Sequence, residues 1–373
     1  MLSETARTNA LAEFRRAPGE HERPGRYWKI DLDGLEIPFE ALVQGSVEIS
    51  FSGELPDGVI ACDLATAERE HGELLRQVFG CTEAASRKFG TLARAYLTGG
   101  AFIYIPDGVE LPHLTVTHRL VGHAGVASTS VLAGNGARGT IVERIEAPAG
   151  AFVCQTSEIV TGERAEITSA AIQQLPLDAR ILASRGARPG RSSRIAFALA
   201  DLGASLAAGS LDVTIAQPGV ESRVSALFFP TSTQHVDLVT RVHHDVGDAV
   251  SRTLVKGAAA GAGQARYVGS IRIAAHAQRS DASLRDDTLL LSEHAHIDSI
   301  PALEIAANDV KAYHGATVGA IDEDERFYIE TRGISRTQAE RMIALGFFES
   351  VVDCFPTETL REQLREALAA KIG

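Results

Sequence analysis

The feature that most constrains the fold is a stretch of some two hundred residues, from about residue 100 to residue 321, without a helical pattern of convincing length. Short runs in it alternate apolar and polar residues, as in "HLTVTHRLVG" (113–122) and "QHVDLVTRVHHDVG" (234–247), and turns rich in Gly, Asn, Asp or Ala separate them. Such alternation predicts strands that present one face to a core. Because no helices intervene, the pattern counts against a βαβ sheet and leaves a sandwich, a barrel or a β-solenoid.

Among these three folds we favour the solenoid, with residues 100–322 as its core. Many runs are only about four to six residues long, and aromatic residues make up just 6% of the chain. Stacked short strands need small side chains inside, since each turn of a solenoid touches only its neighbours. The spacing of the runs is too irregular for a repeat consensus, so the pattern supports a mainly β fold more strongly than a solenoid.

The region before the strands, residues 1–99, carries helical patterns. Residues 64–80 and 82–99 space their apolar side chains three or four apart, and Thr82 is placed to cap the second of these helices. Residues 26–43, "RYWKIDLDGLEIPFEALV", look extended. We expect an N-terminal segment of mixed helical and extended structure.

The region after the strands, residues 323–373, is again helical. Ser335 stands three residues before Gln338, which is the signature of a capping box, and Pro356 is expected to stop that helix. Two apolar stripes run along it and must both be buried, either against the chain's own β-domain or against a partner. Leu360, Leu364 and Leu368 share one face of a last helix. The first stripe contains Ala339, Met342, Ile343, Phe347, Val351 and Cys354, and the second contains Leu345, Phe348, Val352 and Phe355.

The composition excludes several classes of partner. With 48 acidic against 36 basic residues, the formal charge is -12, whereas nucleic acids and anionic membranes both require a positive surface. The N-terminus lacks the apolar segment of a signal peptide, and the longest apolar stretch is interrupted by Asp201. We therefore predict a soluble, cytoplasmic protein with no nucleic-acid or membrane partner. The four cysteines are far apart in sequence and are expected to be small buried residues rather than a thiolate metal site.

One glycine motif resembles a dinucleotide-binding loop but lacks its context. Gly134, Gly136 and Gly139 match G-x-G-x-x-G, yet the following "TIVERIEA" is an alternating strand, whereas the dinucleotide loop must open a helix. The motif is therefore interpreted as a tight turn between strands. The sequence also contains no G-x-x-x-x-G-K-[ST] loop, so the chain is not expected to hydrolyse ATP by itself.

Histidines and carboxylates offer two further candidate sites. His294 and His296 would share a strand face beside Glu293 and Asp298, which would suit a two-His, one-carboxylate metal site, although a polar turn is the favoured interpretation. A carbohydrate-active hydrolase or lyase of the β-helix type would need carboxylates that converge. The candidates for that role are Asp286, Asp287 and Asp298.

The segment 308–319, "NDVKAYHGATVG", places a histidine among small apolar side chains. As a strand, it would align Val310, Ala312, His314, Ala316 and Val318 on one face. His314 could then be a ligand, a catalytic group or a satisfied core residue.

The C-terminal part of the chain resembles the SufB/SufD family of iron–sulfur cluster assembly proteins. Residues 279–352 contain, in order, LLLS, D-S-I-P-x-L-E-I, D-V-K, H-G-A-T-V-G, F-Y, R-G-I, A-E-R-M-I and G-F-F. The resemblance is looser over 235–273, and little is recognised before residue 100. It implies a right-handed parallel β-helix flanked by helical segments, a SufB–SufD heterodimer joined through the β-helix ends, and docking of the ABC-type ATPase SufC on the C-terminal helices.

The resemblance also distinguishes the two branches of the family. Asp286 and Gly315 stand where SufB-type members have cysteine and glutamate, so the chain is of the SufD type. His314 then matches the interface histidine implicated in cluster assembly, and a neutral imidazole can ligate iron. SufD-type members often carry a cysteine where this chain has Ala312. His314 would therefore hold metal only together with ligands from a partner, and we expect a non-catalytic scaffold subunit.

The family further implies which residues contact the ATPase and which cofactors the complex uses. The docking residues that match are Tyr328, Arg332, Gly333, Arg341, Phe347 and Phe348. No cofactor is expected to be bound stably by this chain alone. The complex would carry a transient iron–sulfur cluster, the family also suggests FAD for a reductive step, and a cysteine desulfurase system would act indirectly. A SufB-like homodimeric scaffold remains an alternative, as does the carbohydrate-active enzyme.

Overall fold

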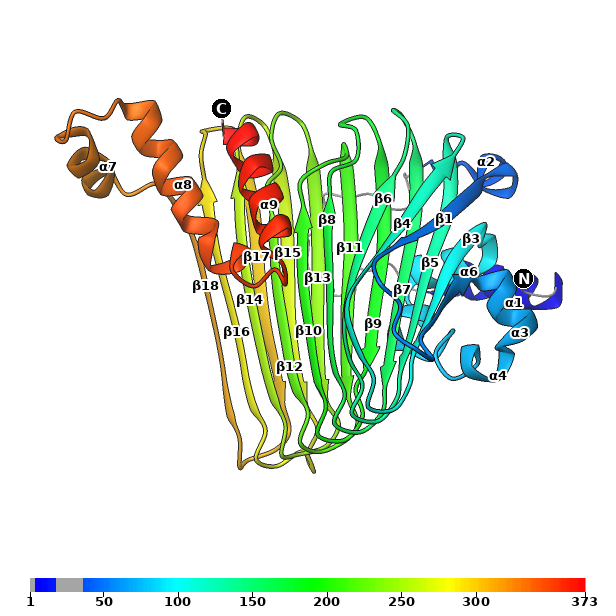
Figure 1. The fold of residues 1–373 in the computed structure, drawn as a ribbon. Coiled ribbons are helices and arrows are strands. Elements are labelled where there is room, and N and C mark those ends of the chain that lie inside the picture. The colour runs from blue at the N-terminus through cyan, green and yellow to red at the C-terminus, as the bar shows by residue number, and fades with distance from the viewer. Residues whose placement is uncertain (1–3, 18–35, 373) are drawn as a thin grey trace.

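Two nine-stranded sheets face each other along the computed structural model of the chain, which describes residues 4–17 and 36–372 (Figure 1). Sheet A contains, in spatial order, β1 (Ser46–Ser52), β4 (Glu110–Val121), β6 (Arg138–Glu146), β8 (Glu166–Gln173), β10 (Arg194–Asp201), β12 (Glu221–Phe228), β14 (Val250–Ala259), β16 (Asp281–Leu290) and β18 (Lys311–Ala320). Sheet B contains β2 (Ile60–Asp63), β3 (Gly99–Ile105), β5 (Ala124–Ala133), β7 (Phe152–Thr161), β9 (Arg180–Arg188), β11 (Leu206–Ile215), β13 (His235–His244), β15 (Gln264–Ile273) and β17 (His296–Ile305).

The chain alternates between the two sheets and forms about eight turns of a solenoid. Each turn contributes one strand to each sheet. Neighbouring strands are parallel, except for the pairs β1–β4 and β2–β3 at the N-terminal end. This confirms the predicted β-solenoid. The strands from β4 onward have 8 to 12 residues, which is longer than expected. In β5, for example, every residue is buried, and this hides the alternation that would have marked its full length.

The turns at one corner of the solenoid share a residue in the left-handed conformation. The N–H groups of these residues continue the ladder between turns: that of Arg164 donates to the carbonyl of Arg191 at 2.8 Å, and that of Ser192 to Pro218 at 3.0 Å. Gly136 occupies this position between β5 and β6, with φ of 64°, which confirms that the glycine motif is a turn. The left-handed residues at this corner are Gly108, Gly136, Arg164, Ser192, Gly219, Asp248 and Arg279.

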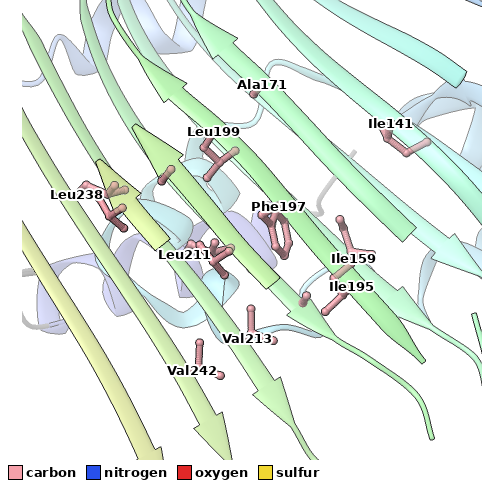
Figure 2. Close-up of a cluster of buried hydrophobic side chains, with 14 of the residues drawn as sticks. Ile141, Ile159, Ala171, Ile195, Phe197, Leu199, Leu211, Val213, Leu238 and Val242 are labelled. Atoms are coloured by element: carbon pink, nitrogen blue, oxygen red, sulfur yellow. The ribbon is translucent and has the colours of Figure 1, made fainter. Parts of the chain in front are cut away.

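Apolar side chains from both sheets fill the space between them. Figure 2 shows Phe197, Leu211 and Val242 among the side chains that point into this core. Polar groups are also buried there. The Glu143 carboxylate accepts hydrogen bonds from Thr129 of β5, at 2.8 Å, and from two side chains of β7. Burying a polar group costs free energy unless hydrogen bonds satisfy it, and these three bonds do so for Glu143.

The N-terminal helices lie partly on the outer face of sheet B. They are α1 (Glu4–Arg16), α2 (Phe39–Gln44), α3 (Leu64–Glu70), α4 (Gly72–Leu75), α5 (Glu83–Ser86) and α6 (Lys88–Tyr96). Each of the two expected helices is thus split in two. Thr82 precedes α5, but its hydroxyl donates to Glu158 at 2.9 Å instead of capping the helix, and its N–H donates to the same carboxylate at 3.0 Å. Of the stretch expected to be extended, residues 26–35 lie outside the described residues, and 39–44 form a helix.

The C-terminal helices are α7 (Glu323–Glu330), α8 (Arg336–Val352) and α9 (Glu358–Ile372). Ser335 and Gln338 form the predicted capping box, whereas α8 ends at Val352, before Pro356 is reached. Helices α8 and α9 pack on the outer face of sheet A, with Leu360, Leu364 and Leu368 buried, while α7 lies beyond the last strand (Figure 1).

Candidate functional site

The C-terminal end of the solenoid exposes the edges of both sheets. In the part of the chain that the structure describes, β18 pairs only with β16, and β17 pairs only with β15. Nearly all of β18 is exposed to solvent, including Tyr313 and Val318. An edge strand offers unpaired N–H and C=O groups to another chain. This end of the molecule therefore has free backbone donors and acceptors with which another chain could pair.

His314 lies on the inward side of that end. It is in register with Leu284, which belongs to the core between the sheets, and Ala312 on the same face packs against that core. The predicted alternation of the segment is thus correct. The side chain of His314 is nevertheless exposed, because no strand follows β18, and it makes no hydrogen bond to a described residue. His314 is therefore not a satisfied core residue.

Asp286 lies one strand deeper, in register with Ala316, and its side chain is fully buried. The hydroxyl of Ser299, on β17 of the opposite sheet, donates to Oδ2, while Oδ1 has no hydrogen-bond partner. Burial raises the pKa of Asp286 to about 7; the negative charge of Asp287 adds to this rise, and the Ser299 hydrogen bond and Lys256 oppose it. Desolvation favours the neutral form of a carboxyl group, so this acid changes charge near neutral pH.

Two further polar groups lie beneath Ser299. Tyr267 is in register with Ser299, and its hydroxyl lies 2.7 Å from that of Thr240. Tyr267 is fully buried, and burial raises its pKa. Asp286, Ser299, Tyr267 and Thr240 thus form a polar region within the last turns of the solenoid. Sequence reasoning missed Ser299, which is 13 residues from Asp286 on the other sheet.

Asp287 points the other way, to the outer face of sheet A. Its carboxylate accepts from Lys256 at 2.9 Å, Arg285 at 2.7 Å and Thr317 at 2.8 Å. Burial alone would raise its pKa, but the hydrogen bonds from Lys256 and Thr317 hold the pKa of Asp287 below its usual value.

The three carboxylates proposed for a carbohydrate-active enzyme do not converge. Asp286 faces the core between the sheets, Asp287 faces the outside of sheet A, and Asp298 lies on β17 beside the exposed His296, with 2.9 Å between Asp298 Oδ1 and His296 Nε2. His294 lies in the preceding turn and is exposed. The predicted polar turn therefore holds for His294 alone, because His296 and Asp298 belong to strand β17.

The expected ATPase-docking residues fall into two environments. Tyr328 is 60% exposed, and Arg332 donates to its hydroxyl at 2.8 Å, while Gly333, with φ of 83°, follows the end of α7. Phe348, by contrast, is fully buried, with its ring centroid 5.8 Å from that of Phe229, the residue that follows β12 of sheet A.

Phe348 therefore packs α8 onto its own domain and is not on a surface that a partner can contact. Phe347 is partly buried and lies under Lys256, and Arg341 is likewise only partly exposed. Sequence reasoning overlooked Phe327, next to Tyr328, whose side chain is 65% exposed.

The cysteines are dispersed, as expected, but only Cys154 is buried; Cys62 and Cys81 are partly exposed and Cys354 is exposed. Burial raises the pKa of Cys62 to about 11 and that of Cys154 to about 12, which disfavours the thiolate that binds metal. Across residues 4–17 and 36–372 there is no group of three or more His, Cys, Asp or Glu side chains that could hold a metal ion. None of the helices described is long and apolar enough to cross a membrane.

Comparison with known proteins gives consistent matches. Residues 116–347 match the family model described as "SUF system FeS cluster assembly, SufBD core domain". The chain is 28% identical over 339 residues to the iron-sulfur cluster assembly protein SufD of Bacillus subtilis, covering 88% of this chain and 78% of the relative. It is 37% identical over 152 residues to SufD of Escherichia coli, covering 40% of this chain and 35% of the relative. A SufBD family protein of Staphylococcus epidermidis is 25% identical over 342 residues, covering 90% and 73% of the two chains.

Proposed function

Because the chain belongs to the SufB/SufD family and is a SufD-like protein of the SUF iron–sulfur cluster assembly system, we propose that it is the non-catalytic half of a two-subunit scaffold. In this proposal, a SufB-type paralogue pairs with the exposed edges of β17 and β18. A SufC-type ATPase docks on the C-terminal helices.

The observation that carries this proposal is the exposed imidazole of His314 on an edge strand that pairs with β16 on one side only. A partner seated on β18 would bring its own side chains to His314, and neutral imidazole is a good ligand for iron. This chain has Ala312 where a thiolate could have stood beside the histidine, and its own cysteines lie elsewhere. The paralogue would therefore supply the cysteines, and the cluster would be a transient product of the complex rather than a cofactor of this chain.

Exposed apolar residues on α7 and α8 support the second docking surface. Besides Phe327 and Tyr328 on α7, Met342 on α8 is exposed, with 52% of its surface accessible. Aromatic side chains on a surface are frequent anchors of protein interfaces. Since the chain has no phosphate-binding loop, the energy of ATP would reach the scaffold through this contact. FAD, if the complex uses it, would likewise be held by the assembled complex.

Replacing His314 by alanine is expected to lower cluster formation by the assembled complex at least about tenfold, because a metal ligand is lost while the fold is untouched. The matched control is His296→Ala, which removes an exposed imidazole from the neighbouring edge strand on the outer face. Both variants would be co-expressed with the paralogue and the ATPase, and cluster content measured by absorbance and iron analysis. Normal cluster formation by His314→Ala would exclude the proposed role.

Replacing Tyr328 by alanine is expected to weaken ATPase binding about tenfold, as is typical for truncation of an exposed aromatic anchor. Val43→Ala is the control, since Val43 is an exposed apolar residue near the N-terminus. Binding of purified ATPase would be measured by calorimetry. Equal affinity for both variants and the unaltered chain would remove α7 from the docking surface.

A further inference from the structure

A row of side chains on the outer face of sheet A connects the last strand to a helix. Lys256 on β14, Asp287 on β16 and Thr317 on β18 are in register on three successive strands. The hydroxyl of Thr317 donates to Oδ1 of Asp287 at 2.8 Å, and Nζ of Lys256 donates to Oδ2 at 2.9 Å. One carboxylate therefore holds both neighbouring strands.

The row continues onto helix α8. Nζ of Lys256 lies 4.3 Å from the centroid of the Phe347 ring, close enough for a cation–π contact. The ring of Phe347 packs at 5.2 Å against Phe348, the residue that anchors α8 on the sheet. A continuous series of contacts thus runs from β18 to α8 through Asp287 and Lys256.

The central pair of this series is poorly accessible to water. The side chains of Asp287 and Lys256 are 8% and 13% exposed. If Lys256 moves away, the Asp287 carboxylate loses its buried cation and keeps only the pair with Arg285, whose side chain is 65% exposed and therefore compensates the charge less well. A displacement of α8 that draws Lys256 away from Asp287 would therefore weaken the hold of Asp287 on Thr317.

We propose that Asp287 is a positioning residue that couples the placement of the edge strand β18 to the placement of helix α8. Its bonds to Thr317 and Lys256 keep the strand and the helix in one arrangement. The functional meaning of the coupling rests on the proposed function, in which β18 carries His314 and the C-terminal helices receive the ATPase. Docking of the ATPase on the C-terminal helices would then change how firmly β18, the strand that meets the paralogue, is held in place.

Hydrogen exchange of the β18 amides in the full chain tests this coupling. In Lys256→Met, the amides of β18 are expected to exchange about tenfold faster, the effect of losing one charge-assisted contact. Lys256 lies on β14 and does not pair with β18, so a purely local effect would stay on β14 and β16. Phe347→Leu, a change on the helix, is expected to speed β18 exchange in the same direction. The double variant should be no faster than Lys256→Met alone.

Arg252→Met is the matched control. Arg252 joins the same two strands, β14 and β16, through a 2.8 Å pair with Asp281. The side chain of Asp281 makes no hydrogen bond to the described residues of β18 or α8, and its link to β18 is the electrostatic influence of Lys311, which is in register with it. Unchanged β18 exchange in Lys256→Met, or an equal change in Arg252→Met, would overturn the proposal. Additive effects of Lys256→Met and Phe347→Leu would overturn it as well, because independent sites add. The hydrogen-exchange experiment is independent of the His314→Ala experiment. The latter tests the scaffold function, whatever the exchange rates of β18 are.

Discussion

In the unaltered protein, the free energy of unfolding is expected to fall between pH 5 and pH 8. In the Asp286→Asn variant, most of this fall should be absent. The folded protein holds the Asp286 proton until about pH 7, whereas an unfolded chain releases it near the ordinary value of 3.8. The folded state therefore binds the proton over this window, and its stability falls as the pH rises through it. From these two pKa values the decline is on the order of 2–3 kcal/mol between pH 5 and pH 8.

Asparagine removes the ionisation and keeps an oxygen that can accept from Ser299. The charged or polar groups that face or surround Asp286 are Asp287, Lys256, Ser299 and Tyr267, and all of them remain in the variant. The slope due to other groups, such as the buried His118 and His244, whose pKa values are lowered by burial, is common to both proteins and cancels in the difference. Urea unfolding at a series of pH values measures the effect.

The neighbouring variant Asp287→Asn provides the control. Its carboxylate is already ionised and paired with Lys256, so this change should lower stability at both pH 5 and pH 8. Most of the slope should remain, because burial is the main cause of the raised pKa of Asp286 and the charge of Asp287 only adds to it. An unchanged slope in Asp286→Asn would show that Asp286 ionises at its ordinary pKa in the folded protein.

Phe348→Ala is expected to destabilise the packing of the C-terminal helices by about 3–5 kcal/mol, the usual cost of removing a fully buried phenylalanine ring. The ring contacts Phe229, just after β12, and Phe347 of its own helix, so its removal leaves a cavity where α8 meets the β-domain. Denaturant unfolding, followed by the circular dichroism of the helices, measures the loss.

Met342→Ala on the same helix is the comparison. Half of the Met342 side chain is already in water, so the change should stay within about 0.5 kcal/mol. A similarly small loss in Phe348→Ala would mean that α8 is not held on sheet A through this residue. It would also restore Phe348 as a residue that a partner could contact.

Much of the fold follows from the sequence because the strand period is simple. Alternation correctly placed His314 on the inward face, and the strand that follows Gly139 correctly excluded a nucleotide loop. Contacts between turns could not be derived in the same way. Equivalent strands of sheet A begin at Glu166, Arg194, Glu221, Val250, Asp281 and Lys311, so the repeat varies between 27 and 31 residues. Without a fixed repeat, the row of Lys256, Asp287 and Thr317 is invisible in the sequence.

Helix α8 shows a second limit. Both of its apolar stripes are expected to be buried, and the sequence alone does not show which residues pack against the sheet. In the structure the buried residues come from both stripes: Ala339 and Val351 of the first and Phe348 of the second are buried, whereas Met342 is exposed. Thr82 is similar: its position before a helix predicts a cap, but a buried carboxylate from a distant strand, Glu158, binds the hydroxyl instead. Long-range polar partners of this kind override local signals.

The uncovered end formed by β17 and β18 has a consequence for the life of the protein in the cell. Two adjacent sheet edges without a covering strand can pair with the edges of other chains and are therefore templates for aggregation. Lys311 opens β18 with a charge, and Gly315 and Gly319 lower its β-propensity, which gives some protection. A chain with this architecture therefore remains exposed to edge-to-edge association as long as nothing covers these two strands.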